Sequence, residues 1–349
     1  MDSTQWPQPS MHVAAAPKSQ PEAIQPFHLY RLWVLFGVIS LTLFGYVMVR
    51  WATSSNFKPT GTGSDPVVWS QKAWAWSFTV ISGIAFCLCI VYLVRQCRLA
   101  RRLTFDTLLF VAWLVVVWQD PGGNYFRVQT LYNSYLLNMG SWSPYIPGWL
   151  SPNGARFPEP ILLYGFVYPT TGLLVAVLAS AAMRRAKRRW PTAGLVGVLL
   201  IGFLVCALAD LVLENAWIHT GLYQDAGVIK GISILGGDRT QFPLYSPILW
   251  GSVWLASGAM RYFRDSRGDS FVERGIGDRS TGRIGATGLR FLALLGFLSV
   301  VYFGYNLAYS DLSLYGGSFP KGYPSYMING MCGPGTDVAC QPPKAPPVG

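Results

Sequence analysis

Seven apolar segments divide the chain, and each approaches the length of roughly 20 residues that a helix needs to cross a bilayer. They lie near residues 31–51, 74–95, 104–120, 161–183, 194–217, 243–262 and 288–309. The third segment is the weakest, because Asp106 and Asp120 bracket its short uncharged core. The pattern predicts an all-α fold, a polytopic membrane helical bundle of about seven transmembrane helices, within a range of six to eight.

The connections between these segments indicate an orientation. Lys and Arg number 16 in one alternate set of connections, near 95–102, 184–190 and 261–290. They number only 8 in the other set, near 52–72, 120–160, 218–242 and 310–349. The positive-inside rule therefore predicts a cytoplasmic N-terminus and an extracytoplasmic C-terminus.

Three regions follow from this pattern. Residues 1–29 are rich in Pro, Gln and Ser and predict a disordered cytoplasmic tail, residues 30–310 a transmembrane helical domain, and residues 311–349 an extracytoplasmic C-terminal tail. Cys332 and Cys340 in that last region either form a small disulfide or remain free thiols.

Composition agrees with a membrane protein and argues against other classes. Hydrophobic residues make up 51% of the 349 and charged residues only 12%. The net charge of +11 is explained by the basic loops, and no basic, aromatic-rich soluble face predicts nucleic-acid binding. The expected partners are the lipid bilayer and a hydrophobic small molecule, and the oligomeric state is left open.

The most informative polar feature is a pair of carboxyls on the fifth apolar segment. Asp210 and Glu214 are four residues apart, so they share one helical face. Ionisable residues in a membrane helix are costly and normally face a protein interior or a water-filled cavity. The pair predicts a place where protons are handled, although both residues could instead only fix helix packing.

Two long outer connections, near 119–160 and 218–245, are dense in aromatic residues, Pro and Gly, and predict an ordered lid. Asp120 begins the first and Glu159 closes it, while His219 begins the second. Each has a simpler interpretation as well: Asp120 as a helix cap, Glu159 as an interfacial charge and His219 as a solvated residue. Together with the pair on the fifth segment, they place the candidate chemistry on the outer side.

The motifs exclude several kinds of site. With three His and no HExxH or CxxC pattern, we expect no metal, and no glycine-rich nucleotide loop or other signature predicts a cofactor. Cofactor-free acid–base work on an apolar substrate remains, because a carboxyl in a low-dielectric pocket holds a proton that it can donate.

Short motifs also resemble a known family. They are Trp118-Gln-Asp-Pro121, Asn124-Tyr125, Asn133-Ser-Tyr135, Gly140-Ser-Trp142, Pro147-Gly-Trp149, Glu214-Asn-Ala-Trp217, Thr220-Gly-Leu-Tyr223 and Gln241-Phe-Pro-Leu-Tyr245. With them the chain resembles the AveC-like spirocyclases of bacterial membranes over roughly residues 30–310. The resemblance implies spiroketal formation on a polyketide-like substrate in secondary metabolism, with dehydration in some members, in a bacterial cytoplasmic membrane.

Within that hypothesis, Glu214 is the leading acid, Asp210 its partner and Asp120 the alternative base. The expected substrate-binding residues are Asn124, Tyr125, Asn133, Trp142, Glu159, Asn215, Trp217, His219 and Tyr223. Asn124, Asn215 and His219 are expected to orient the reacting groups.

Two other functions stay open. A membrane-embedded terpene cyclase would also use carboxylate protonation, and a lipid- or small-molecule-binding membrane protein would use the carboxylates only for packing. An enzyme is favoured over a binding protein. If Asp210, Glu214 and Asp120 line one cavity, an enzyme or a binder is favoured; if each is tied to one neighbouring helix, packing is their role.

Overall fold

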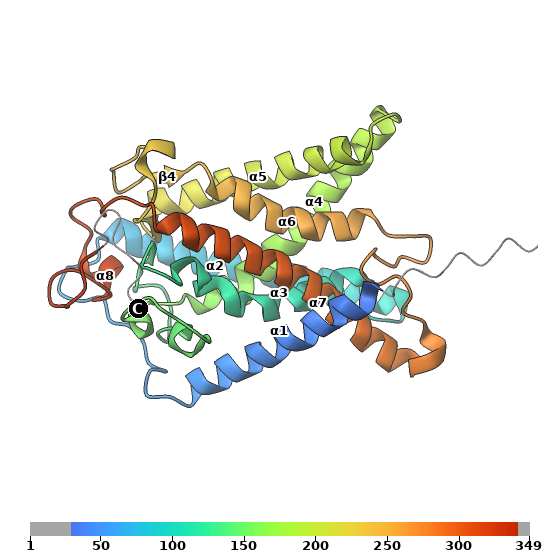
Figure 1. The fold of residues 1–349 in the computed structure, drawn as a ribbon, viewed down its shortest axis with the longest axis horizontal. Helices are drawn as coiled ribbons and strands as arrows, with labels where there is room; N and C mark the ends of the chain where they lie inside the picture. The colour runs from blue at the N-terminus through green and yellow to red at the C-terminus, as the bar shows by residue number, and fades with distance from the viewer. Residues whose placement is uncertain (1–28, 341–349) are drawn as a thin grey trace, which may run out of the picture.

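The computed structural model describes residues 29–340, which fold mainly into helices. The long helices run along one axis, and the connections gather at the two ends of the bundle (Figure 1). The helices are α1 (Leu29–Ala52), α2 (Trp69–Ala100), α3 (Phe105–Val116), α4 (Tyr168–Arg189), α5 (Leu195–Thr220), α6 (Ser246–Tyr262), α7 (Asp278–Ser313) and the short α8 (Ser325–Ile328). The predicted tail 1–29 lies outside the described residues except for Leu29, the first residue of α1.

All seven predicted apolar segments form helices, and five of these are long and apolar enough to cross a membrane. These five are Leu29–Ala52, Trp69–Ala100, Leu163–Arg189, Leu195–Thr220 and Ile284–Ser313. The other two helices are shorter, because α3 has 12 residues and α6 has 17. The structure therefore confirms a mostly helical membrane protein with five candidate spans.

The shortness of α3 has a local cause. Thr104 caps its first turn, where its hydroxyl accepts a hydrogen bond from the Thr107 N–H at 3.3 Å. At the other end Pro121 lacks an N–H, and the chain tightens into the 3₁₀ helix η1 (Val117–Asn124). As a result, Asp120 lies on an irregular turn at the end of α3.

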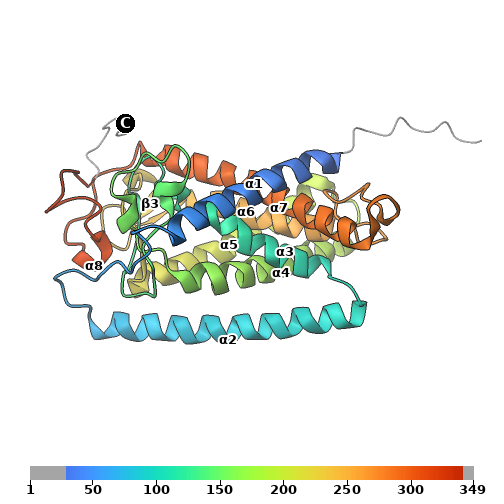
Figure 2. The same cartoon turned by 90° about the horizontal axis from the view of Figure 1, so that it is seen from below.

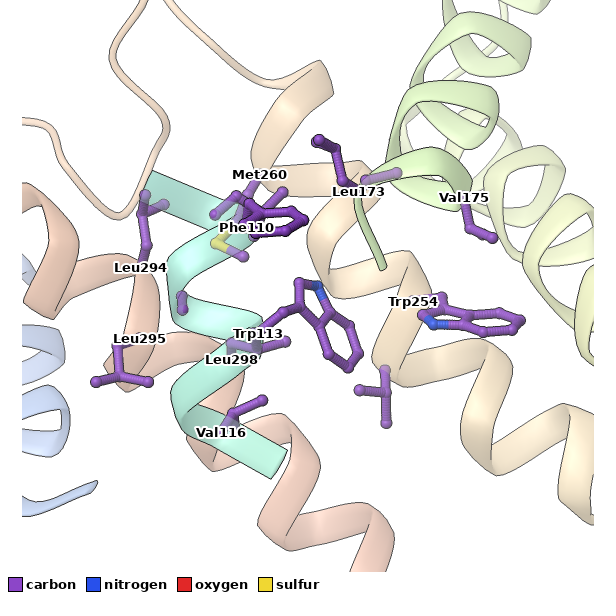
Figure 3. Close-up of a cluster of buried hydrophobic side chains, with 14 of the residues drawn as sticks. Phe110, Trp113, Val116, Leu173, Val175, Trp254, Met260, Leu294, Leu295 and Leu298 are labelled. Carbon is purple, nitrogen blue, oxygen red and sulfur yellow. The ribbon is translucent and has the colours of Figure 1, made fainter. Parts of the chain in front are cut away.

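The hydrophobic core forms around α3, which is packed between α4, α6 and α7 (Figure 3). Trp113 is fully buried at its centre and donates its indole N–H to the Ser257 hydroxyl at 3.1 Å. Gly172 faces the same indole, and a Cβ there would come within 2.4 Å of it. This close packing fixes the position of η1, because η1 follows directly from α3.

The helix α2 is less buried than the other four candidate spans. It runs along one side of the bundle (Figure 2), and only 11% of its most apolar window is buried. Its side chains are therefore mostly available to face lipid, with a few turned toward the other helices.

At one end of the bundle the long connections fold into an ordered layer, which we call the cap. It contains β1 (Thr130–Tyr132), β2 (Tyr223–Asp225), β3 (Ser233–Ile234), β4 (Phe242–Pro243) and the 3₁₀ turns η2 (Ser143–Tyr145), η3 (Gly154–Arg156) and η5 (Lys230–Ile232). β1 pairs antiparallel with β2, so that Thr130 lies opposite Asp225 and Tyr132 opposite Tyr223. The two long connections are thus joined directly to each other, as an ordered lid requires.

The segment expected as a C-terminal tail packs on this cap. The Ser134 N–H donates to the Tyr326 carbonyl at 2.9 Å, and Tyr326 and Met331 are buried. Cys332 and Cys340 form a disulfide. Residues 341–349 of the predicted tail lie outside the described residues.

Candidate active site

A cavity of about 380 Å³ lies under the cap, between α2 and the rest of the bundle. Its walls come from α2, α4, α5, α6 and α7 and from the paired strands β1 and β2. Asp120, Asp210 and Glu214 all line it. By the criterion given above, this arrangement favours an enzyme or a binding protein over a packing role for the three carboxyls.

Two carboxyl groups on the cavity wall, Asp210 and Glu214, lie near a third, Asp225, behind the wall, and we call the three the carboxyl cluster. The Glu214 carboxyl lies within hydrogen-bonding reach of both the Asp210 and the Asp225 carboxyls. Two carboxyls can share a hydrogen bond only when one of them keeps its proton. The cluster therefore holds at least one proton in a place where it faces the cavity.

Hydroxyl groups fix two members of the cluster, Glu214 and Asp225. The Ser246 hydroxyl donates to Glu214 Oε2 at 2.6 Å, and Tyr223 and Tyr309 each donate to Asp225 Oδ1 at 2.8 Å. No described N–H or hydroxyl group donates to Oδ2 of Asp225. Burial first, and then the negative charge of Glu214, raise the pKa of Asp225 well above its ordinary value.

Asp120 occupies a separate position on the cavity wall, surrounded by phenols. Tyr168 and Tyr302 donate to its Oδ1 at 2.7 Å, and Tyr164 donates to its Oδ2 at 2.8 Å. Tyr164 lies on η4 (Leu163–Val167), a single π-helical turn at the start of α4. Such turns re-aim side chains and are frequent at functional sites.

Glu159 is fully buried and connects to Asp120 through Tyr164. Its Oε1 accepts a hydrogen bond from the Ser141 hydroxyl at 3.0 Å, and its Oε2 contacts the Tyr164 hydroxyl. That hydroxyl has one proton and contacts two carboxyls, so one of the carboxyls must donate to it. Burial, followed by the charge of Asp120, raises the pKa of Glu159 well above its ordinary value, which favours its protonated form.

Aromatic rings form much of the remaining wall. Tyr305 stacks between Tyr302 and Tyr309, with ring centroids 5.7 Å and 5.5 Å away, and its ring meets Trp250 edge-on at 4.9 Å. It lies within electrostatic reach of Asp120 and of the carboxyl cluster. Trp217 also lines the cavity and packs edge-on against Phe78 of α2. Aromatic faces of this kind favour positive charge that develops between them.

Of the predicted substrate-binding residues, Trp217 and Tyr223 lie on the cavity wall. Four others build the cap instead. The Asn124 carboxamide accepts hydrogen bonds from the N–H groups of Gln129 and Thr130 at 2.7 and 2.8 Å, and thereby shapes the start of β1. Asn133 donates to the Gly221 carbonyl at 3.1 Å, which ties β1 to the end of α5.

The two aromatic residues among these four are also structural. Trp142 donates to the Trp118 carbonyl at 2.8 Å and packs against Tyr164, while Tyr125 packs edge-on against Trp149. None of the four residues is part of the cavity wall. Their side chains hold the shape of the lid.

Asn215 and His219 lie on α5 but do not line the cavity. His219 is exposed, and its Nδ1 lies 2.9 Å from the Asn215 carbonyl oxygen one turn earlier. Glu159 is also outside the wall and reaches the cavity only through Tyr164.

Asp225 and the tyrosines of α7, Tyr302, Tyr305 and Tyr309, were not among the predicted site residues. Asp225 lies in a connection without periodicity, so its approach to Glu214 depends on the pairing of β1 with β2. The tyrosines carried a signal that could have been used: Tyr302, Tyr305 and Tyr309 recur at a helical spacing on an otherwise apolar segment. Among residues 29–340, no group of three or more His, Cys, Asp or Glu residues is arranged to hold a metal ion.

Comparison with known proteins gives one match. A family model described as "Spirocyclase AveC-like" matches residues 100–327, which confirms the predicted resemblance, although the match begins at the end of α2 rather than near residue 30. No curated protein and no solved structure matches the chain. The matched region contains the carboxyl cluster, Asp120, Glu159 and the cap. The chain therefore belongs to the AveC-like spirocyclase family.

Proposed function

We propose that the protein is a membrane cyclase that closes a spiroketal, with loss of water, on a hydrophobic polyketide-like substrate and without a cofactor. The observation that carries this proposal is the presence of Asp120, Asp210 and Glu214 on the wall of one largely apolar cavity. Carboxyls in such a place can exchange protons with a bound apolar molecule at neutral pH.

The reaction needs one proton delivered and one removed. In a hydroxyketone that has closed its first ring as a hemiketal, Glu214 protonates the hemiketal hydroxyl, and the C–O bond breaks to release water and an oxocarbenium ion. A second substrate hydroxyl then attacks this carbon, and its proton passes to a carboxylate. The carboxyl cluster supports both steps, because Asp210 and Asp225 can hold or return the proton that Glu214 uses.

The oxocarbenium ion carries a positive charge in an environment with little water. Tyr305 and Trp250 present aromatic surface where that charge would develop, and Asp120 contributes negative charge nearby. Asp120 is also the end of the path from Glu159 through Tyr164, which gives it a source of protons away from the substrate.

An apolar substrate would enter from the bilayer, between α2 and α5. Trp74 and Ile81 of α2 and Leu213 of α5 line the cavity and are also exposed at the surface. In this proposal α3 and α6 complete a bundle of seven spans, and the cap lies outside the cell. The Cys332–Cys340 disulfide supports an extracytoplasmic location of the cap, since disulfides persist in oxidising compartments.

The test uses the protein in native membranes with a dihydroxyketone of polyketide type. Mass spectrometry follows the loss of one water, and NMR identifies the spiroketal product. Wild-type protein should form a single stereoisomer, whereas Glu214→Gln should reduce the rate by about 10²–10⁴-fold while remaining folded in the membrane. Equal rates for wild type, Glu214→Gln and empty membranes would refute the proposal.

The aromatic wall also fits a second candidate, because carbocations of terpene cyclisation need the same stabilisation. A parallel assay with a polyene epoxide separates the two. If only the polyene epoxide is converted, the protein is a terpene cyclase. If either compound binds tightly and neither is converted, the protein is a binding protein.

A further inference from the structure

A second cavity lies at the end of the bundle opposite the cap, which we call the basic end. It has a volume of about 600 Å³ and is lined by residues of the α2–α3 corner, of the end of α6 and the turn after it, and of α7. Five arginines contribute to its wall: Arg102, Arg261, Arg264, Arg267 and Arg290. Three acidic residues do so as well: Asp106, Asp269 and Glu273.

Two of the acidic residues, Asp106 and Asp269, form ion pairs with arginines, and Glu273 accepts a hydrogen bond from the Ser270 N–H at 2.8 Å. Arg261 clasps Asp106 with two hydrogen bonds, of 3.0 Å from Nε and 3.2 Å from Nη2. Asp269 lies 3.3 Å from an Arg290 nitrogen and 3.5 Å from one of Arg267. Within the cavity wall, positive charge therefore exceeds negative charge by two.

The excess belongs to Arg102 and Arg264. Neither has a carboxylate within salt-bridge distance among the side chains that the structure describes. The Arg264 guanidinium lies over the Phe105 ring, 5.2 Å from its centroid. Both side chains are exposed, so an anion can reach them.

The remaining wall has apolar parts, including Leu103, Phe105 and Leu108, and Leu103 is exposed. A phosphate group alone would not use this surface, whereas a phospholipid places apolar glycerol ester groups beside its phosphate. The cavity also lies at the ends of the spans, at the depth of lipid headgroups, and basic pockets between spans are known to bind such groups.

We propose that this cavity binds the phosphate of an anionic phospholipid, with Arg102 and Arg264 as its ligands. The phosphate would link the α2–α3 corner to the turn after α6, in addition to the Asp106–Arg261 ion pair and the contact of Arg264 with Phe105. Binding therefore stabilises the fold. This inference does not depend on the reaction proposed for the cavity under the cap.

The test measures thermal unfolding of delipidated protein in neutral detergent with added phosphatidylglycerol, phosphatidylcholine or inorganic phosphate. Phosphatidylglycerol should raise the midpoint at concentrations where phosphatidylcholine does not. Arg102→Gln and Arg264→Gln should each require about fivefold more phosphatidylglycerol for the same rise in midpoint. The double variant should require more than either single variant. A response to inorganic phosphate as strong as that to the lipid would assign the site to free phosphate.

Arg98→Gln and Arg188→Gln are the matched controls, because both arginines are exposed and neither lines the cavity. They should keep the full response to phosphatidylglycerol. If neither phosphatidylglycerol nor phosphate exceeds phosphatidylcholine, or if Arg102→Gln and Arg264→Gln respond like the controls, the proposal is wrong. Arg102 is exposed and forms no ion pair with a described side chain, so its variant tests the site even if Arg264→Gln unfolds.

Discussion

The Asp225 carboxyl lies against the Glu214 carboxyl, although Asp225 belongs to a short strand of the cap and Glu214 to the helix α5. The contact joins the lid to the membrane-spanning part of the molecule at the point where protons are held. The position of the cap strand β2 therefore determines the surroundings of Glu214.

Asp225→Asn should therefore remove most activity. The amide keeps the size of the side chain and can still accept hydrogen bonds from Tyr223 and Tyr309, but it cannot exchange a proton with Glu214. We expect a loss of about 10²-fold or more in turnover, with unchanged circular dichroism. Asp311→Asn, an exposed carboxyl on α7, is the control and should retain full activity. Turnover within twofold of wild type would remove Asp225 from the mechanism.

Tyr164→Phe should disconnect Glu159 from Asp120 without changing the packing of the ring. Glu159 has a raised pKa, so it is protonated at low pH and loses its proton as the pH rises through that raised value. Wild-type activity should fall over the pH range in which Glu159 loses its proton. Tyr164→Phe should be about tenfold slower, and its activity should not depend on pH over that range.

A pH–rate profile of Glu159→Gln provides the second readout for this path. This profile should not show the fall in activity with rising pH, because the amide does not titrate. Tyr315→Phe, at an exposed tyrosine, is the control for loss of a hydroxyl. Identical profiles in all four proteins would show that Glu159 has only a packing role.

Ala216→Trp should obstruct the proposed entry from the bilayer. Ala216 is exposed and lines the cavity, whereas Val212, one turn earlier, is exposed and does not line it. Because the acid groups stay in place, we expect KM to rise several-fold more than kcat falls. Val212→Trp should behave like wild type, and equal kinetics for both variants would place the entry elsewhere.

Glu273→Gln should change how stability depends on pH. Burial raises the pKa of Glu273 from 4.5 to about 7 in the folded protein. The stabilisation tied to its protonated form is complete below pH 4.5 and is lost as the pH rises through about 7. At pH 8 the variant should exceed wild type by up to about 3 kcal/mol, and at pH 4 the two should agree. The prediction would be contradicted if the unfolding free energies of variant and wild type differed by the same amount at pH 8 and at pH 4.

The proposed orientation can be tested with single cysteines in a cysteine-depleted chain. Ala100→Cys and Arg188→Cys lie at the basic end and Leu235→Cys in the cap, and all three positions are exposed. A membrane-impermeant maleimide added to intact cells should label only Leu235→Cys. Labelling of the first two instead would invert the topology.

The sequence predicted the helices well because apolar segments are local signals, although only five of the seven are long and apolar enough to cross a membrane. It also predicted the cavity face of α5, since Asp210 and Glu214 share that face through helical spacing alone. Asp225 could not be assigned in this way, because its position depends on the pairing of Thr130 with Asp225 across nearly a hundred residues. Aromatic and amide residues in the lid were predicted as substrate ligands, but Asn124 and Asn133 satisfy backbone groups of the cap.

The loose attachment of α2 has a further consequence. A helix that supplies part of a cavity wall but little of the core can vary in sequence with small effects on folding. Nearly all of α2 also lies outside the region that the family model matches. Chimeras that exchange only this helix between relatives should therefore change which molecules are accepted, while the acid groups and the stability of the host remain intact.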